Sequence, residues 1–170
     1  MGLDMYLFVE KSTYISHYDL KAHPEKQELV KDFFPKELKT FQDQIFERNF
    51  LDKTERFQIG YWRKANAIHN WIVQNCADGV DECQDIFLSE EKISTLRDLC
   101  IKVLDNPQDS ANLLPTASGF FFGSQAYDEW YMDEIKYTKD LLDQVLAFLS
   151  DRENEETPGI YYSILYRASW

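Results

Sequence analysis

Cysteine is scarce in this chain, and its spacing excludes the structures that cysteines most often build. The three thiols, Cys76, Cys83 and Cys100, are odd in number and show no C-x-x-C spacing. Neither a disulfide framework nor a zinc site follows from such a set. No two of the three histidines share one face of a predicted helix, so we expect no metal site. No motif points to a cofactor, and we expect none.

Basic residues are also few, and this shortage bears on the choice of partner. Lysine and arginine total 18 against 30 aspartates and glutamates, which gives a net charge of -12. An acidic surface repels phosphate backbones and lacks the long-range attraction that nucleic-acid binders use. Direct binding to DNA or RNA is therefore not expected.

Long apolar runs are missing as well. Residues 1–9 have no basic flank, and their apolar run is too short for a signal peptide or a membrane span. We therefore expect no membrane association and a location in a reducing cytoplasm. A homo-oligomer stays open.

What is present fits one globular domain covering residues 1–170. A chain of this length buries roughly 70% of its unfolded surface, which is enough for a real core. Hydrophobic residues make up 44% of the sequence and charged residues 28%, as is ordinary for globular proteins.

The hydrophobic pattern predicts an α+β fold. A small, mainly antiparallel sheet is expected to include an N-terminal strand at 3–10 and a C-terminal strand at 160–167, with a short strand at 85–88. Three main helices are expected to cover it. Residues 38–51 suit a helix or a strand, and 151–159 form a polar turn. The three helices are predicted at 61–76, 89–104 and 127–149.

The stretch 113–131 gathers glycines, hydroxyls and aromatics more densely than any other part of the chain. Gly119 and Gly123 bracket three phenylalanines, and Ser124 or Asp128 is placed to begin the next helix. Two interpretations stay open here. One is a short strand at 119–123 whose phenylalanines enter the core; the other is a loop that also contacts a ligand, where glycine lets the backbone approach closely and the helix start attracts anions.

The first predicted helix carries an apolar face that includes Trp62, with His69 in its middle. Arg63 and Asn66 lie along one border of that face, and Lys64 lies along the other. The border groups are expected to edge a pocket between this helix and the sheet.

The last predicted helix has polar residues within its apolar face, namely Glu134 and Thr138. Acidic side chains are almost never fully buried unless they are paired. We therefore expect Glu134 either to reach water through a cleft or to meet a partner such as His69 or Arg63.

The motifs Y-W-R-K-A-N-A-I-H-N-W, L-L-P-T-A-S-G-F-F-F-G-S and Y-D-E-W-Y resemble those of a group of small uncharacterised proteins of tailed bacteriophages and prophages. The opening M-G-L-D-M-Y-L and the closing Y-R-A-S-W are similar too, so the likeness spans most of the chain. It implies no catalytic residues. It implies a phage-encoded protein in the cytoplasm of a bacterial host that acts against host defence.

The leading hypothesis is a non-enzymatic protein that sequesters a small anionic, nucleotide-like ligand, such as a host immune signal. Aromatic faces stack on bases, while arginine, lysine and hydroxyls hold phosphates. The ligand site is expected where loop 113–124 meets the starts of the first and third predicted helices. The candidate residues are Trp62, Arg63, Lys64, Asn66, His69, Thr116, Ser118, Gly119, Phe121, Gly123, Ser124, Tyr127, Trp130, Tyr131, Glu134 and Thr138.

Two alternatives remain. The first is an acidic inhibitor that binds a host defence protein directly, which the charge of -12 favours through electrostatic complementarity. The second is a small nucleotide-acting enzyme in which His69 and Glu134 form a general acid/base pair. The sequence favours binding over catalysis because it carries no catalytic signature.

Overall fold

The computed structural model describes residues 2–24, 27–31, 33–46, 50–153 and 159–170. Contacts group the chain into two compact units, which we describe separately. Unit 1 comprises Met1–Val9, Phe57–Glu155 and Ser163–Trp170, and unit 2 comprises Glu10–Arg56 and Glu156–Tyr162. The prediction of one domain covering 1–170 stays a prediction.

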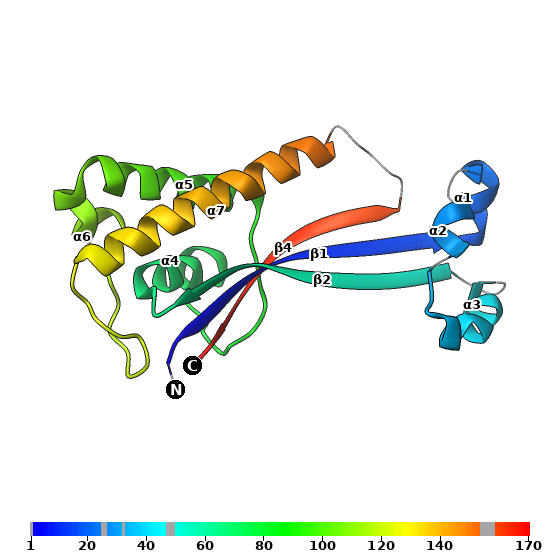
Figure 1. The fold of residues 1–170 in the computed structure, drawn as a ribbon, viewed down its shortest axis with the longest axis horizontal. Coiled ribbons are helices and arrows are strands. Elements are labelled where there is room, and N and C mark those ends of the chain that lie inside the picture. The colour runs from blue at the N-terminus through cyan, green and yellow to red at the C-terminus, as the bar shows by residue number, and fades with distance from the viewer. Residues whose placement is uncertain (1, 25–26, 32, 47–49, 154–158) are drawn as a thin grey trace. The chain divides into compact units, whose positions relative to one another are not determined.

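The α+β class and the antiparallel sheet are confirmed. The strands are β1 (Asp4–Ser16), β2 (Phe50–Arg63), β3 (Ile86–Phe87) and β4 (Ile160–Ser169). Their order in the sheet is β2-β1-β4-β3, so the N-terminal and C-terminal strands are neighbours (Figure 1). Strand β3 pairs antiparallel with β4, with Ile86 opposite Tyr166.

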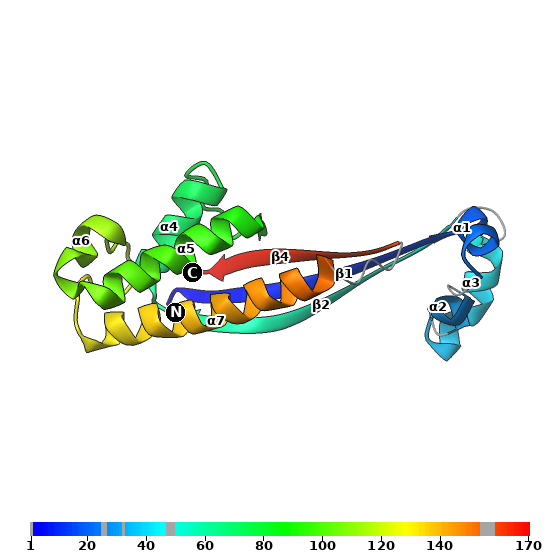
Figure 2. The same cartoon turned by 90° about the horizontal axis from the view of Figure 1, so that it is seen from above.

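Unit 1 holds the helices α4 (Asn66–Cys76), α5 (Glu90–Asp105), α6 (Ser110–Leu113) and α7 (Glu129–Glu153), with a 3-10 turn at Pro107–Asp109. Helices α5 and α7 run side by side, as both views show (Figure 1 and Figure 2). The core of this unit joins the helices to alternate residues at the start of the chain, because Leu3, just before β1, and Met5 and Leu7 of β1 are fully buried.

Local signals fixed the ends of α5 as predicted. The Ser89 side chain accepts a hydrogen bond from the Lys92 N–H and so caps the helix, which has Glu90 and Glu91 in its first turn. The helix ends at Asp105, before Pro107. Helix α7 begins at Glu129 and continues to Glu153, four residues beyond the predicted end, so it takes in the start of the expected polar turn. Residues 154–158 of that turn lie outside the described residues.

The prediction of a helix at 61–76 is wrong in its first turn. Strand β2 continues to Arg63, and α4 begins only at Asn66. Burial alternates along the strand, since Trp62 is buried while Tyr61 and Arg63 are exposed. Aromatic residues suit a half-buried strand, and Lys64, with a φ of 63°, breaks the strand before the helix.

Unit 2 contains α1 (His17–Ala22), α2 (Gln27–Lys31), the 3-10 helix η2 (Lys36–Leu38) and α3 (Lys39–Phe46). The segment 38–51, which suited either a helix or a strand, therefore divides into a helix and the start of β2. The core of unit 2 is formed by Ile15, Phe33 and Leu51. Buried Gln42 ties α3 to the preceding segment, because its amide donates to the Val30 carbonyl oxygen at 2.9 Å.

Candidate functional site

The side chain of Asn66 holds the 116–124 loop against the start of α4. It is 3% exposed. Its Oδ1 accepts from the Ala117 N–H at 3.0 Å, and its Nδ2 donates to the carbonyl oxygens of Phe122 at 3.0 Å and Ser124 at 2.8 Å. Three hydrogen bonds from one buried amide fix both arms of the loop. The described contacts of Asn66 therefore position the loop backbone.

The segment 119–123 is a turn, so its interpretation as a strand is wrong. Gly123 has a φ of 83°, a left-handed backbone conformation that glycine adopts without a steric penalty. The three phenylalanines point to different surroundings. Phe120 is 96% exposed, the Phe121 ring stacks on Trp170, and the Phe122 ring lies edge-on to His69 at 5.1 Å.

The far arm of the loop leads into α7. Asp128 caps this helix, because its Oδ1 accepts from the Tyr131 N–H at 3.1 Å. The Tyr131 hydroxyl donates to the Leu114 carbonyl oxygen at 2.9 Å, and burial raises the pKa of Tyr131 to about 12. The Thr116 N–H donates to the Tyr127 hydroxyl at 3.2 Å. These bonds fasten the start of α7 to the beginning of the loop.

A cavity of about 210 Å³ lies where this loop meets the starts of α4 and α7. This is the place at which the sequence predicted a ligand site. The wall is mostly apolar, with a few polar groups. Its lining comprises Lys64, Ala65, Asn66, Ala67, Ile68, Thr116, Gly123, Ser124, Ala126, Asp128, Trp130, Tyr131, Glu134 and Ile135.

The charged groups of the cavity are Lys64, Asp128 and Glu134. Lys64 is exposed, whereas Glu134 is half-buried. Burial raises the pKa of the Glu134 carboxyl to about 7, and the negative charge of Asp133 adds to the rise. Glu134 lines the cavity, but its Oε2 atom is closed to solvent and has no hydrogen-bond partner among the described residues, so neither expected outcome is fully met.

The first turn of α4 also contributes to the wall, through Asn66, Ala67 and Ile68. The residue before it, Ala65, makes no side-chain cap hydrogen bond to this turn. Helix starts leave backbone N–H groups without an intrahelical partner, and the helix dipole makes this end positive. The cavity therefore has a weakly electropositive side formed by Lys64 and α4.

Several predicted site residues serve the core of unit 1. Trp62 is 2% exposed, and its Nε1 donates to Thr138 Oγ1 at 2.8 Å. Thr138 is fully buried and donates in turn to the Glu134 carbonyl oxygen at 2.7 Å. These two side chains join β2 to α7 beneath the cavity residue Glu134.

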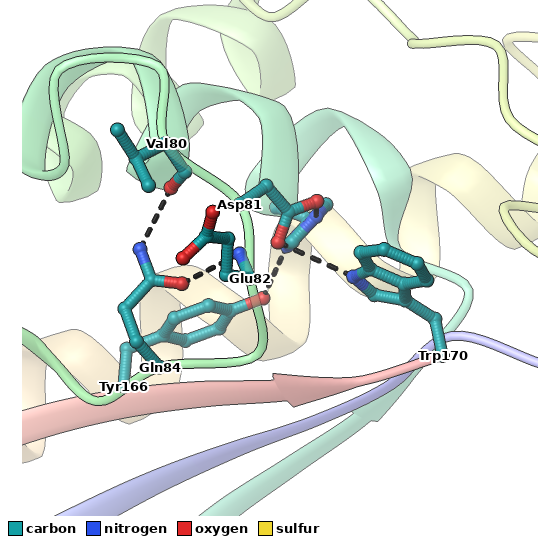
Figure 3. A network of polar contacts seen from close by, with 7 residues as sticks. Val80, Asp81, Glu82, Gln84, Tyr166 and Trp170 are labelled. Atoms are coloured by element: carbon teal, nitrogen blue, oxygen red, sulfur yellow. Dashed lines mark hydrogen bonds and ion pairs between the residues drawn. The ribbon is translucent and has the colours of Figure 1, made fainter.

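His69 occupies a separate polar network, whose members Asp81, Tyr166 and Trp170 are labelled in Figure 3. The His69 Nδ1 atom lies 2.7 Å from the Tyr166 hydroxyl, and its Nε2 atom lies 3.0 Å from Asp81 Oδ2. The Trp170 indole donates to the other Asp81 oxygen at 3.2 Å, and burial raises the pKa of Tyr166 well above its ordinary value. Both nitrogens of His69 are thus engaged, which does not support the expected pairing of His69 with Glu134.

The remaining predicted residues lie outside the lining. Arg63 is exposed, with its Nε 3.9 Å from Asp4 Oδ1. Ser118 and Gly119 are exposed on the loop, and Tyr127 is 41% exposed. The structure therefore brings together, from the predicted set, the residues Lys64, Asn66, Thr116, Gly123, Ser124, Trp130, Tyr131 and Glu134.

Sequence patterns missed the small and aliphatic part of the wall, which is formed by Ala65, Ala67 and Ile135. Such residues carry no chemical signal, and only their place on the first turn of α4 and beside Glu134 gives them a role. Asp81 was also missed as the partner of His69. Asp81 lies in the segment A-D-G-V-D, whose composition is typical of a turn but does not indicate what the turn contacts.

Comparison with known proteins leaves this site to be interpreted from its own residues. No protein-family model, curated protein or solved structure matches the chain. Within the described ranges, no helix combines the length and the apolar character needed to cross a membrane. In the same part of the chain, no group of three or more histidine, cysteine, aspartate or glutamate side chains is placed to hold a metal ion.

Proposed function

We propose that this chain is a non-enzymatic binding protein that sequesters a small anionic, nucleotide-like ligand in the cavity between α4, the 116–124 loop and α7. The observation that carries the proposal is the cavity itself, at the junction where aromatic, hydroxyl and basic residues converge. Concave, mostly apolar sites with a few placed polar groups are the usual form of small-molecule pockets.

The dimensions support capture of one part of such a ligand. Typical pockets for drug-sized molecules have volumes of about 300–1000 Å³, and this cavity has about 210 Å³. It fits a single ring system, with the rest of the ligand outside. Trp130 lines the cavity and is 59% exposed, so its ring is available to stack on a base.

The electropositive side supports an anionic substituent. Lys64 is exposed and lines the cavity, so its ammonium group is accessible to a phosphate in solvent. The first turn of α4 has no side-chain cap; the Asn66 N–H already donates to the Lys64 carbonyl oxygen at 2.8 Å, and the N–H groups that follow it are of the kind that hold phosphates elsewhere. A sequestered host immune signal is the biological extension of this proposal, and it draws on the resemblance to small phage proteins.

The test is a thermal-shift and calorimetric screen of mononucleotides and cyclic nucleotides. A ligand that binds only the folded state stabilises it by RT ln(1 + [L]/Kd), so the melting temperature rises with the logarithm of its concentration once that exceeds Kd. Lys64→Ala is expected to weaken binding at least fivefold, whereas Arg63→Ala, next to it but outside the lining, serves as the matched control. No shift with any nucleotide contradicts the proposal.

A second candidate, the acidic inhibitor of a host protein, is favoured by one observation. Phe120 is 96% exposed at the tip of the turn, and the chain carries a net charge of -12. An exposed aromatic on an acidic protein suits an interface with a basic partner. Phe120→Ser is expected to abolish binding to such a partner without changing the melting temperature.

The enzyme alternative gains no comparable support. Its acid/base pair requires His69 beside Glu134, and the His69 nitrogens contact Tyr166 and Asp81 instead. Turnover of a nucleotide panel that disappears in both His69→Ala and Glu134→Ala remains the result that favours it.

A further inference from the structure

The cavity contains a buried acceptor that the described residues leave unsatisfied. The Oε2 atom of Glu134 is inaccessible to solvent and has no hydrogen-bond partner within the described ranges. Buried polar atoms almost always have a partner, and each exception calls for an explanation. Here the side chain forms part of a cavity wall, and a rotation of the carboxylate about its Cγ–Cδ bond is needed to present this atom to a group inside the cavity.

A carboxylate oxygen without a hydrogen-bond partner in this position is costly to the free protein. When a carboxyl group is removed from water without a compensating hydrogen bond, its charged form is disfavoured. This agrees with the rise in the pKa of Glu134. A ligand that brings N–H donors recovers this cost on binding. A ligand edge that carries only hydrogen-bond acceptors places its lone pairs against those of the Glu134 carboxylate, and the two repel each other.

The shape and the remaining wall select a flat ring over an ammonium ion. An engineered apolar cavity of about 150 Å³ takes benzene, so a volume of about 210 Å³ suits a ring system of somewhat larger size. The wall around Glu134 is formed by apolar groups such as Ile68, Ile135 and Tyr131. The lining charges are Lys64 on one side of the balance and Asp128 and Glu134 on the other, so the choice of a flat ring rests on the volume and on the apolar part of the wall.

We infer that the cavity takes a nucleobase whose edge presents two adjacent N–H donors, as guanine does, with the Glu134 carboxylate as their acceptor. Guanine offers its N1–H and its 2-amino group on the Watson–Crick edge, and a carboxylate accepts from both in a bidentate pair. This inference rests on the proposed function and specifies the class of base. Adenine presents an acceptor at N1 and is disfavoured.

Placing the base at Glu134 also determines where the phosphate of the nucleotide lies. With the base edge at Glu134, the exposed ammonium group of Lys64 is the lining cation that a phosphate outside the cavity meets. The ligand class is therefore a guanine nucleotide held at its base by α7 and at its phosphate by the segment before α4.

The experiment compares guanosine, inosine and adenosine 5′-monophosphates by calorimetry at pH 8, with the wild type and two variants. Glu134→Gln keeps the size of the side chain but replaces one acceptor by a donor. Asp133→Asn removes the same charge from the exposed neighbour on α7, which does not line the cavity, and is the matched control.

The wild type and Asp133→Asn are expected to bind the guanine nucleotide about 10–100-fold more tightly than the adenine nucleotide, the range that one bidentate base contact gives. Inosine monophosphate, which lacks the 2-amino group, is expected to lie between them. Glu134→Gln is expected to remove the preference. Equal affinity for all nucleotides, or a preference that survives in Glu134→Gln, overturns the inference but leaves the binding function standing. Absence of binding by every nucleotide overturns both.

A pH series gives a second readout. The ratio of the two affinities cancels the titration of the phosphate, which the ligands share. The groups around Glu134 are Asp133 and Tyr131 on its own helix, Asp128 immediately before that helix, and Lys64 from the segment before α4. The preference is expected to fall as the pH drops below 7 in the wild type. A preference for guanine that grows at low pH contradicts the inference.

Discussion

The Nδ2 atom of Asn66 donates to the carbonyl oxygen of Ser124 at 2.8 Å, and this bond ties the first residue of α4 to the end of a loop 58 positions away in sequence. The same amide also bonds Ala117 and Phe122. One buried side chain therefore holds the loop that forms part of the cavity wall. The site depends on it even though the amide is already fully engaged with protein groups.

Asn66→Ala is expected to lower the free energy of unfolding by about 2–4 kcal/mol, because three hydrogen bonds are lost and backbone groups of the loop are left without partners. Urea denaturation measures the change. Asn75→Ala, on the same helix but exposed, is the control and is expected to cost less than about 0.5 kcal/mol. Similar losses in the two variants contradict the role given to Asn66.

Gly123→Ala tests the turn. The backbone at Gly123 has a φ of 83°, and an added Cβ meets the Lys64 side chain at 3.0 Å. The left-handed conformation costs an alanine about 1–2 kcal/mol, and the contact adds to it. Gly79→Ala, with a φ of 78° and its nearest neighbour at 3.6 Å, isolates the backbone cost. A smaller loss at Gly123 than at Gly79 in thermal unfolding counts against the observed packing.

Thr138→Val removes the acceptor of the buried Trp62 indole while keeping the shape of the side chain. The Trp62 N–H is then left without a partner, and we expect a loss of about 1–3 kcal/mol in the free energy of unfolding. Thr95→Val is the control, because exposed Thr95 bonds only the preceding turn of its own helix, at Glu91. Equal effects of both substitutions would show that the indole finds another partner.

Glu134 makes stability depend on pH in a defined direction. Its folded-state pKa of about 7 lies above the ordinary value of 4.5, so the folded state holds the proton more tightly than the unfolded state. The contribution of this group to the free energy of unfolding therefore decreases as the pH rises from about 4.5 to about 7.

Glu134→Gln is expected to be more stable than the wild type by about 1–2 kcal/mol at pH 8, a figure reduced for partial exposure, and equal to it near pH 4.5. Urea unfolding at both values measures the difference. Glu37→Gln removes the same charge at an exposed position and is the control. A Glu134→Gln variant that is less stable at pH 8 would falsify the assignment.

The sequence determined the elements whose signals are local. Ser89 and Pro107 marked the ends of α5 because caps and proline act through neighbouring backbone groups. Alternation in β1, and the aromatic and β-branched content of β4, identified the terminal strands. Glycines and hydroxyls in the 113–124 loop, together with the apolar stripes of two helices, predicted that this loop meets two helix starts. A cavity lies at that place.

Tertiary structure decided what each polar side chain does. An apolar face that contains His69, Asn66 or Thr138 is compatible with a ligand contact or with a partner far away in the chain. The partners are Asp81 for His69, Ser124 for Asn66 and Trp62 for Thr138, and no local pattern encodes these pairings because they depend on how distant elements pack. The same packing moved Trp62 from a helix to a strand and left the Glu134 Oε2 atom without a partner at the cavity.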